Sequence, residues 1–484
     1  MKDISRNLTM LVDYYELTMA NGYFQSGMKD KIAYFDVFYR ENPENGGFAI
    51  AAGLEQVVDY INRLHFDEDD IAFLRGKNCF GENFLEYLRT FRFTGDIWAV
   101  PEGTVVFPGE PLLTVRAPAT EAQFIETYIL MVLNHESLIA TKAARITRAA
   151  KGRAISEFGS RRAQGADAAM LGARAAYIGG VNATACAISD EVFGVPATGT
   201  MAHSWVQMFD SEYEAFRTYC ELYPTNATLL IDTYNVMESG LPNAIRAFKE
   251  VLLPKGITKC GVRIDSGDIA YLSCKIREVL DSEGLTDCII VASNSLDEYI
   301  IRGLFHQGAK VDAFGVGERL ITAKSDPVFG GVYKLCAVEN ENGEIVPKIK
   351  LSENVGKITT PHFKKVYRLF GRDTGKAEAD LICVYDETVD DTKPLEIFDP
   401  ENTWKTKTLE NFRAEELLLK IFENGKQVYT LPTLKEIRVH CKASLESMWE
   451  EVKRFDNPHN YYVDLSEKLW NIKYSMIKEQ RHKK

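Results

Sequence analysis

Short apolar runs alternate with polar, glycine-bearing turns and helical stretches through the middle of the chain. Seven such units follow one another, with apolar runs at residues 154–159, 176–180, 193–197, 228–232, 261–265, 288–293 and 312–316. Continuous apolar runs of this length are typical of strands covered on both faces, and their alternation with helices predicts a parallel sheet. Such a row of βα units forms either a closed barrel or an open, doubly wound sheet.

Polar side chains or glycines follow most of these runs, where each strand would end. They are Glu157 with Arg161 and Arg162, His203 with Ser204, Asp232 with Thr233, Arg263 with Asp265, Ser266 and Asp268, Ser293 with Asn294, and Gly315 with Gly317. The loops after the strands of a barrel meet at one mouth, whereas an open sheet gathers them only where its strand order reverses. We therefore expect an α/β fold with an irregular, TIM-like β/α barrel.

The residue types at these strand ends suit a ligand with phosphate and sugar groups. Guanidinium groups bind phosphate with paired hydrogen bonds, aspartates accept from ribose hydroxyls or hold Mg²⁺ through water, and glycine-turn amides bind anions. The turn at 198–204 presents His203 beside Ser204, and a histidine there can serve as base, proton shuttle or phosphate acceptor. Each feature alone has an ordinary alternative, such as a packing histidine or a plain turn at 265–268.

Different patterns flank the predicted barrel. Helical stripes, then short strands with Pro-Gly turns, come before it; after about residue 335 alternating strands return, and the segment from Thr433 is charged and helical. We predict an N-terminal α+β domain at 1–133, a catalytic barrel at 134–332 and a C-terminal region of strands then helices at 333–484. The α+β domain is expected to draw on both flanking segments.

Composition narrows the class of protein. The chain has 484 residues, enough for two or three domains, and its nine scattered cysteines argue against a disulfide framework or a structural zinc site. Residues 1–20 lack a signal-peptide pattern, and no apolar run approaches the ~18–20 residues of a membrane span. The net charge of −12 disfavours nucleic acid and anionic membranes as partners. We expect a cytoplasmic metabolic enzyme with small-molecule substrates.

One segment runs against the acidic net charge. Residues 141–175 hold eight Lys or Arg and two acidic residues, which is typical of a site for a polyanionic substrate. Lys142, Arg145 and Arg148 repeat at helical spacing, so we interpret them as an exposed helix face. Arg161 and Arg162 remain candidates for substrate binding.

These motifs together resemble the nicotinate phosphoribosyltransferases, a family of type II phosphoribosyltransferases. The matching segments, in family order, are residues 11–20, 157–165, 199–204, 231–234, 261–268, 293–294 with 297–298, 315–317, 331–335 and 457–459. The resemblance covers nearly the whole chain. One departure lies at Glu318 and Arg319, a charged pair where relatives often have small or hydroxyl residues, and it leaves the phosphate contacts there open.

The resemblance implies transfer of phosphoribosyl from 5-phosphoribosyl-1-pyrophosphate to nicotinate, in the NAD biosynthesis that salvages nicotinic acid. Nicotinate mononucleotide and pyrophosphate would be the products, Mg²⁺ the cofactor and ATP a hydrolysed co-substrate, with His203 as the phosphohistidine. It also implies a homodimer with shared active sites, in which Tyr15 of the neighbouring subunit stacks on the pyridine ring.

The remaining candidate residues divide by role. Asp232 and Asp265 would serve the ribose and Mg²⁺, and Arg161 and Arg263 the substrate anions. The expected 5-phosphate ligands are Ser293, Asn294, Gly315 and Gly317. Gly199 and Ser204 complete the expected substrate-binding set.

Two other classes of protein compete with this interpretation. An aldolase or isomerase acting on a phosphosugar would want a strand-end lysine or a base beside a carbonyl, and no lysine stands at the seven predicted strand ends. A non-catalytic nucleotide-binding protein would not need the full set of acids, arginines and histidine.

Quinolinate and nicotinamide phosphoribosyltransferases are the close alternatives within the group, and Ser204 after His203 favours nicotinate. The type I phosphoribosyltransferase fold is disfavoured, because its acidic pair followed by a threonine-glycine-threonine loop is not found.

Overall fold

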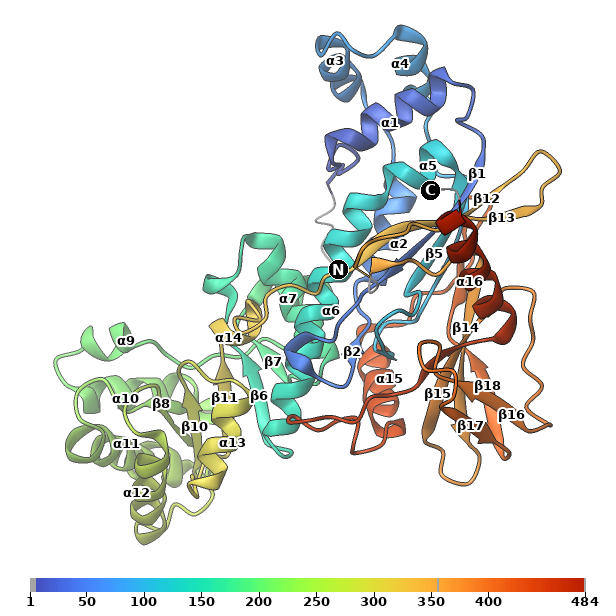
Figure 1. The fold of residues 1–484 in the computed structure, drawn as a ribbon. Helices are drawn as coiled ribbons and strands as arrows, with labels where there is room; N and C mark the ends of the chain where they lie inside the picture. The colour runs from blue at the N-terminus through green and yellow to red at the C-terminus, as the bar shows by residue number, and fades with distance from the viewer. Residues whose placement is uncertain (1–5, 355–356, 483–484) are drawn as a thin grey trace. The chain divides into compact units, whose positions relative to one another are not determined.

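The computed structural model describes residues 6–354 and 357–482, which fall into two compact units. Unit 1 comprises residues 139–327, and unit 2 joins the segment up to Leu138 with the segment from Val328. Figure 1 shows unit 1 in green to yellow and unit 2 in blue and in orange to red. Unit 2 is therefore built from two stretches of sequence that unit 1 separates.

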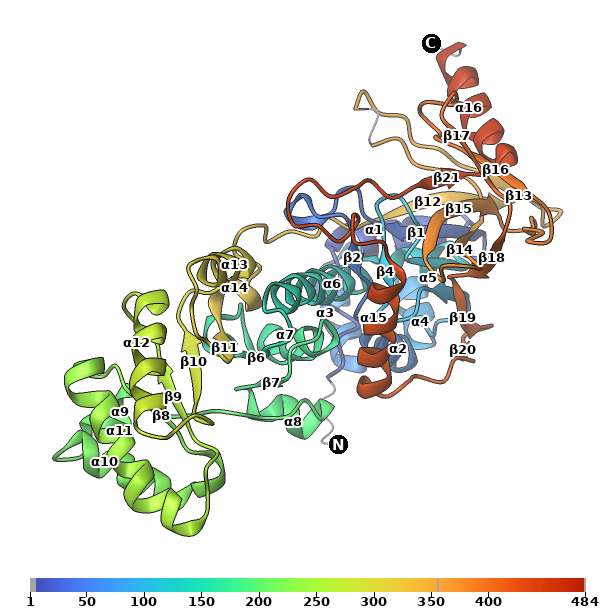
Figure 2. The same cartoon turned by 90° about the horizontal axis from the view of Figure 1, so that it is seen from below.

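Unit 1 contains a six-stranded parallel sheet (Figure 2) with the order β7-β6-β11-β10-β9-β8. Its strands are β6 (Ala154–Glu157), β7 (Ala183–Thr184), β8 (Thr228–Leu230), β9 (Gly261–Ile264), β10 (Ile289–Ser293) and β11 (Ala313–Val316). Alternate residues such as Val262, Ile290 and Val316 are fully buried, as expected for strands covered by helices. The predicted row of parallel βα units is confirmed. It forms a half-barrel in which β7 and β8 are the outermost strands.

The helices of unit 1 lie between these strands in the sequence. They are the C-terminal part of α6 (Glu126–Ala149), η2 (Ser160–Arg162), α7 (Ala166–Ile178), α8 (Ala187–Phe193), α9 (His203–Gln207), α10 (Glu212–Leu222), η3 (Pro224–Asn226), η4 (Val236–Gly240), α11 (Leu241–Ala247), η5 (Phe248–Leu252), η6 (Leu253–Lys255), α12 (Ile269–Ser282), α13 (Glu298–His306) and α14 (Glu318–Ile321).

Two of the seven predicted strands are not formed at the predicted residues. Residues 176–180 form the buried end of α7 and its glycine turn, and the strand β7 follows at Ala183–Thr184. A fully buried helix reads as a continuous apolar run, so sequence alone does not separate it from a buried strand. In the run 193–197 only Ala197 pairs, through a single parallel bridge to Thr184.

Unit 2 is built around a seven-stranded sheet with the order β13-β12-β1-β5-β3-β19-β20, in which every pairing is antiparallel. These strands are β1 (Ile32–Phe38), β3 (Asp96–Ala99), β5 (Leu113–Pro118), β12 (Val332–Glu339), β13 (Ile345–Pro347), β19 (Leu419–Glu423) and β20 (Lys426–Gln427). The N-terminal and C-terminal segments thus share one sheet, as the predicted composite α+β domain requires.

A second, four-stranded sheet and two small pairs complete the strands of unit 2. The larger sheet has the order β18-β14-β15-β21. Its strands and those of the two pairs are β14 (Lys364–Gly371), β15 (Ala377–Val384), β18 (Phe412–Glu416), β21 (Val463–Leu465), β16 (Leu395–Phe398), β17 (Thr406–Leu409), β2 (Ala49–Ile50) and β4 (Val105–Val106). The helices are α1 (Tyr14–Gln25), η1 (Pro43–Asn45), α2 (Leu54–Arg63), α3 (Glu68–Gly76), α4 (Glu82–Arg89), α5 (Ala119–Phe124), the start of α6, α15 (Leu434–Ser447) and α16 (Glu467–His482).

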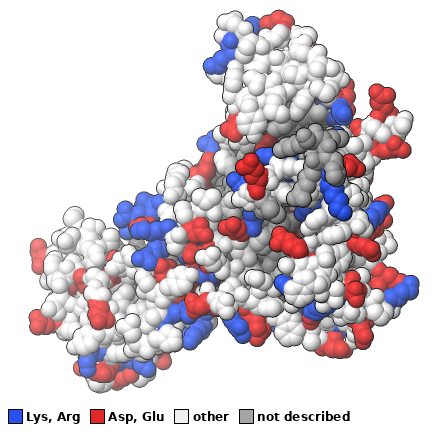
Figure 3. All heavy atoms as spheres, in the orientation of Figure 1, with Lys and Arg blue, Asp and Glu red and all other residues white. Residues whose placement is uncertain are grey.

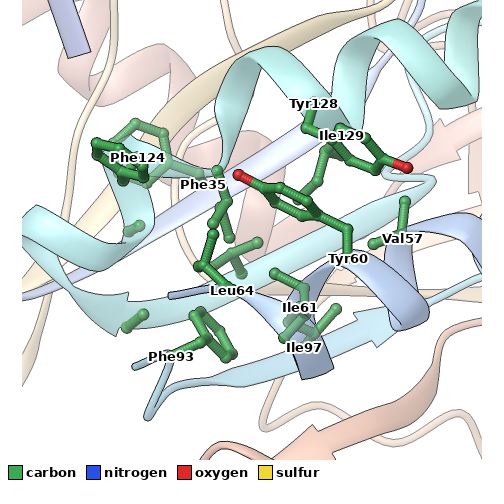
Figure 4. Close-up of a cluster of buried hydrophobic side chains, with 14 of the residues drawn as sticks. Phe35, Val57, Tyr60, Ile61, Leu64, Phe93, Ile97, Phe124, Tyr128 and Ile129 are labelled. Atoms are coloured by element: carbon green, nitrogen blue, oxygen red, sulfur yellow. The ribbon is translucent and has the colours of Figure 1, made fainter. Parts of the chain in front are cut away.

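The main core of unit 2 lies between this seven-stranded sheet and the helices α1, α2, α5 and α6 (Figure 4). The rings of Tyr60 on α2 and Tyr128 on α6 stack with centroids 4.0 Å apart. Aromatic burial on this scale stabilises the packing of the helices against the sheet. Within the described residues, no helix is long and apolar enough to cross a membrane.

Candidate active site

The carboxyl ends of four neighbouring strands bring the predicted site residues of unit 1 together. The parallel register pairs Ser293 with Gly315 and Val316 with Glu157, while β9 lies on the other side of β10. Side chains that follow these strands therefore share one edge of the sheet, as the barrel prediction requires.

Arg263 is the centre of the polar contacts at this edge. Its Nε donates to Ser293 Oγ at 2.9 Å, and its Nη1 donates to Thr200 Oγ1 at 3.0 Å and to the Met201 carbonyl at 3.4 Å. Its Nη2 lies 3.2 Å from Asp265 Oδ1, and the side chain is 15% exposed. The guanidinium is thus oriented by neighbours on three segments while part of it still reaches solvent.

Asp232 sits beside this arginine network, after β8. Its side chain is 1% exposed. Its Oδ2 accepts from the backbone N–H of Asp265 at 2.9 Å and from Ser266 Oγ at 2.6 Å, whereas its Oδ1 has no hydrogen-bond partner among the described residues. A buried carboxylate oxygen without a partner is costly, so this oxygen is a candidate for contact with a ligand or metal ion.

His203 stands at the first position of α9, next to Asp232. A hydrogen bond of 3.1 Å joins its Nδ1 to Thr233 Oγ1, and its Nε2 lies 3.9 Å from Asp232 Oδ1. The imidazole is 39% exposed. One ring nitrogen is therefore oriented by a hydroxyl, and the other faces a carboxylate at a distance too long for a direct hydrogen bond.

Glu157 organises the turn after β6. It accepts hydrogen bonds from the backbone N–H of Gly159 and from Thr184 Oγ1, the latter at 2.7 Å. Burial raises the pKa of this carboxyl above its usual range, and the two hydrogen bonds oppose that shift. Glu157 thus holds the turn that leads to Arg161 and Arg162, which are both exposed.

Basic side chains gather on this part of unit 1. Figure 3 shows a group of Lys and Arg side chains over the region where α14 and the start of α7 lie in Figure 1.

One glycine within β11 and the glycine directly after it pack closely against Phe158. A Cβ at Gly315 would lie 2.4 Å from Phe158 Cδ2, and one at Gly317 would lie 3.2 Å from the Phe158 carbonyl oxygen. The Arg263 guanidinium lies 5.5 Å from the centre of the same Phe158 ring. Phe158 therefore fills the space beside the glycine turn and supports the arginine.

The loop after β10 carries backbone strain. Asn294 and Ser295 have φ angles of 92° and 47°, which non-glycine residues rarely adopt. Asp297 then caps α13 by accepting from two amides of its first turn, and Arg319 donates to the same carboxylate. Strained backbone of this kind is concentrated at binding sites, and here it directly follows Ser293.

The charged pair that departs from the family pattern has local partners. Arg319 pairs with Asp297, and Glu318 accepts from Lys324 Nζ at 2.6 Å. Both charges therefore have a structural role next to the glycine turn.

The interpretation of Lys142 and Arg145 as an exposed helix face is wrong. Both side chains are buried, and they surround Glu298: Lys142 Nζ lies 2.9 Å from Oε2 and Arg145 Nε lies 2.8 Å from Oε1. Helical spacing alone could not reveal this, because their partner comes about 150 residues later in the chain. The buried triad ties α6 to the start of α13.

Comparison with known proteins bears on the whole chain. Residues 10–134 match the N-terminal domain of nicotinate phosphoribosyltransferase, and residues 363–473 match its C-terminal domain. The nicotinate phosphoribosyltransferase of Bacillus subtilis (strain 168) is 43% identical over 473 residues, covering 98% of this chain and 96% of that protein. The chain belongs to the nicotinate phosphoribosyltransferase family.

Other members of the family agree with this assignment. The human nicotinate phosphoribosyltransferase is 31% identical over 529 residues, with 97% of each chain covered. The crystal structure of human nicotinic acid phosphoribosyltransferase superimposes with a TM-score of 0.83 at 29% identity, covering 96% of this chain. The resemblance drawn from the dispersed motifs is confirmed.

Three residues predicted from the family motifs have no hydrogen bond to the cluster around Arg263 among the described residues. Gly199 and Ser204 are exposed on either side of the cluster residues Thr200 and Met201. Tyr15 belongs to unit 2, where it is exposed on α1, and burial of part of the ring raises the pKa of its hydroxyl, as does the charge of Glu126. The assignment of these residues to the family's substrate site remains a prediction.

Two residues of the cluster were missed in the sequence, and a third, Ser266, was named at its strand end without its contact to Asp232. Thr200 lies inside a motif that was recognised, and its hydroxyl was the available signal. Phe158 gave no polar signal, because its role is to fill space beside a glycine that has no side chain.

Proposed function

We propose that this protein is a nicotinate phosphoribosyltransferase that forms nicotinate mononucleotide and pyrophosphate from nicotinate and 5-phosphoribosyl-1-pyrophosphate. In this role it acts in the salvage of nicotinic acid for NAD biosynthesis. Two findings support the proposal: full-length similarity to proteins of that name, and a strand-end cluster of arginine, aspartates and histidine. The cluster around Arg263 and Asp232 is the deciding observation, because its residue types suit this reaction independently of the similarity to other proteins.

Displacement at the anomeric carbon of ribose passes through an oxocarbenium-like state while pyrophosphate departs. Fixed positive charge is needed for the leaving group, and fixed negative charge for the cationic sugar. Arg263, held by Ser293 and Thr200, supplies the first. The carboxylates of Asp232 and Asp265 supply the second, without reorganising at the moment of reaction.

The same two carboxylates are suited to Mg²⁺. This ion usually takes one or two carboxylates together with waters and substrate phosphates, and the partnerless Oδ1 of Asp232 fits that requirement. No set of three or more His, Cys, Asp or Glu side chains in the described part of the chain is arranged for a metal ion, in keeping with a site that the substrate completes. When bound, Mg²⁺ neutralises charge on the pyrophosphate.

The remaining candidates bind the substrate. In this proposal the 5-phosphate is held by backbone amides and hydroxyls after β10 and β11, from Ser293, Asn294, Gly315 and Gly317. Arg161, Gly199 and Ser204 contact other parts of the substrates.

The proposal predicts product formation with nicotinate, and little with nicotinamide or quinolinate, in an assay of all three with and without ATP. Equal or greater turnover of another pyridine would assign the protein to a different member of the group.

In this proposal ATP acts by phosphorylating His203. In the proposed step the γ-phosphoryl group leaves ADP and bonds to a ring nitrogen; Nδ1 contacts Thr233, so Nε2 is the acceptor. The new negative charge beside Asp232 then changes the affinity of the site for its anionic substrates.

The phosphohistidine can be tested by labelling. Incubation with γ-labelled ATP should give acid-labile, base-stable label on His203. The variant His203→Ala should lose stimulation by ATP while keeping slow transfer. Stimulation that persists in His203→Ala would defeat this role.

The proposed homodimer is tested by mixing subunits. If Tyr15 closes the site of its partner, one variant at Tyr15 and one at His203, each without ATP-stimulated activity, should recover that activity when combined. Random exchange makes half the dimers mixed, each with one intact site, so about a quarter of wild-type activity should return. No recovery after verified exchange would remove Tyr15 from the partner's site.

A further inference from the structure

Two buried cysteines lie side by side at the amino ends of neighbouring strands. Cys260 directly precedes β9 and Cys288 directly precedes β10, and these parallel strands pair Gly261 with Ile289. The backbone N–H of Ile289 donates to the Cys260 carbonyl at 3.0 Å, so the register extends back to the two cysteines. Residues that face each other on adjacent strands are ~4.8 Å apart, within the Cα separation that a disulfide spans.

The surroundings of the pair favour the reactive form of one sulfur. The Cys288 thiol donates to the Ile289 carbonyl at 3.9 Å, and its interaction with Cys260 lowers the pKa of the Cys260 thiol while raising that of Cys288. The nearby guanidinium of Arg277 lowers the pKa of Cys260 further, against the opposing effects of burial and Asp287. A thiolate next to a second thiol is the arrangement found in redox-active dithiols.

Arg277 is fixed in place for this role. Its Nη1 donates to the Cys288 carbonyl at 2.6 Å, its Nη2 to the Leu285 carbonyl at 2.8 Å, and its Nε to Asp281 at 2.8 Å. The positive charge therefore stays beside the pair instead of moving into solvent.

We propose that Cys260 and Cys288 form a redox-active dithiol, which peroxides convert into a disulfide joining β9 and β10 at their amino ends. The Cys260 thiolate attacks one oxygen of hydrogen peroxide, the O–O bond breaks, and a sulfenic acid forms as water leaves. The Cys288 sulfur then attacks the sulfenic sulfur, the S–O bond breaks and a second water departs. Two thiols lose two electrons and two protons in all, and one peroxide gains them.

The position of the bond gives it a structural effect. Arg263, near the end of β9, and Ser293, at the end of β10, hydrogen-bond to each other at the opposite edge of the sheet. A disulfide would fix the same two strands at their other ends. The modification is remote from the phosphoribosyl chemistry, so it can be measured without an activity assay.

The test is oxidation of the reduced, full-length protein by an equimolar amount of hydrogen peroxide. After alkylation in denaturant, the number of free thiols should fall by two from the original nine. Mass spectrometry of an unreduced digest should show the Cys260 peptide linked to the Cys288 peptide, and a dithiol reductant should remove the link. Circular dichroism before alkylation establishes that the protein is still folded when it reacts.

Matched variants separate this pair from the other cysteines. Cys274→Ser removes a neighbouring thiol on α12 and should leave the linked peptide unchanged. Cys288→Ser should leave Cys260 as a sulfenic acid that dimedone traps. The proposal is overturned if folded wild-type protein keeps both thiols while the exposed Cys79 is oxidised, or if Cys260 instead links to Cys220, the buried thiol on α10. The wild-type result decides the matter even where a variant fails to fold.

Discussion

Two clusters of charged side chains, one in each unit, use the same residue types in different ways. In unit 2, Arg368 is 2% exposed and donates to both carboxylate oxygens of Asp380, at 2.8 Å and 2.5 Å, and to the Val105 carbonyl at 2.8 Å. In unit 1, Arg263 is 15% exposed and approaches one oxygen of Asp265 at 3.2 Å. The first pair is closed to solvent, and the second is open.

The ion pair of the closed cluster also has more of its contacts made. Tyr461 donates to Asp380 at 2.9 Å, and burial together with the charge of Asp380 raises the pKa of the neighbouring Glu110 carboxyl well above its usual range. The open cluster leaves Asp232 Oδ1 without a partner among the described residues. Glu110 Oε1, buried in the closed cluster, also has no hydrogen-bond partner among the described residues, so access to solvent is what separates the two clusters. We infer that an ion pair closed to solvent stabilises the fold, whereas an open one beside the unpaired oxygen of Asp232 is arranged for a ligand.

The largest effect expected from this comparison is on stability, in the variant Arg368→Ala. Removing the arginine leaves Asp380 charged, buried and without its ion pair, which should cost about 3–5 kcal/mol of unfolding free energy. Denaturant unfolding measures the loss. Arg372→Ala, which removes an exposed arginine in the turn after β14, is the control and should cost at most about 1 kcal/mol. Similar losses of unfolding free energy in the two variants would mean that closing the Arg368–Asp380 pair to solvent does not stabilise the fold.

The second prediction concerns Arg263→Ala, which should damage activity far more than stability. Loss of a charge-assisted contact to the departing anion should remove about 2–4 kcal/mol of transition-state stabilisation, or roughly 30-fold to 1000-fold in kcat/KM. Arg263→Lys should recover only part, since an ammonium group cannot form the paired hydrogen bonds. Arg217→Ala, an exposed change in the same unit, should leave kcat/KM unaltered. A fall of less than about threefold in Arg263→Ala would remove this residue from substrate contact.

The third prediction concerns the pH dependence of stability, at a buried carboxyl on α1. Burial raises the pKa of Glu16 to about 8 from 4.5, and Thr127 donates to it through its hydroxyl and its backbone N–H. Folding therefore takes up a proton between these two pH values, so stability is greatest below the window and falls as pH rises through it.

Glu16→Gln should abolish the fall in stability with pH, because the amide has the shape of the neutral carboxyl but does not titrate. Urea midpoints measured below, within and above the window should be flatter in this variant than in wild type. Glu86→Gln, at an exposed position on α4, should retain the wild-type slope. Parallel curves for Glu16→Gln and wild type would show that Glu16 does not titrate across the window.

Part of this molecule could be predicted from local sequence. Strands β6, β8, β9, β10 and β11 were found because buried strands read as short apolar runs, and the polar residues after them mark one edge of the sheet. The Arg263 and Asp232 cluster follows from that placement.

What could not be predicted depends on partners far apart in the chain. Lys142 and Arg145 have the spacing of an exposed helix face, but Glu298 buries them. Arg368 and Asp380 gave no signal as a buried pair, because charged residues in strands more often face solvent. The end of α7 was mistaken for a strand because a helix buried on every side shows no periodicity.

The sheet of unit 2 has a consequence for the order of events during synthesis. β1 lies between β5 and β12, and β12 begins at Val332, nearly 300 residues after β1 ends. At ~5–20 residues per second, β1 emerges from the ribosome ~15–60 s before β12 does, and β5 ~10–45 s before it. Unit 1 is continuous in sequence and is made completely in that interval. The nascent chain therefore carries an unpaired strand edge on β1 until β12 is made, and one on β3 until β19 is made, and such edges can pair wrongly with other strands.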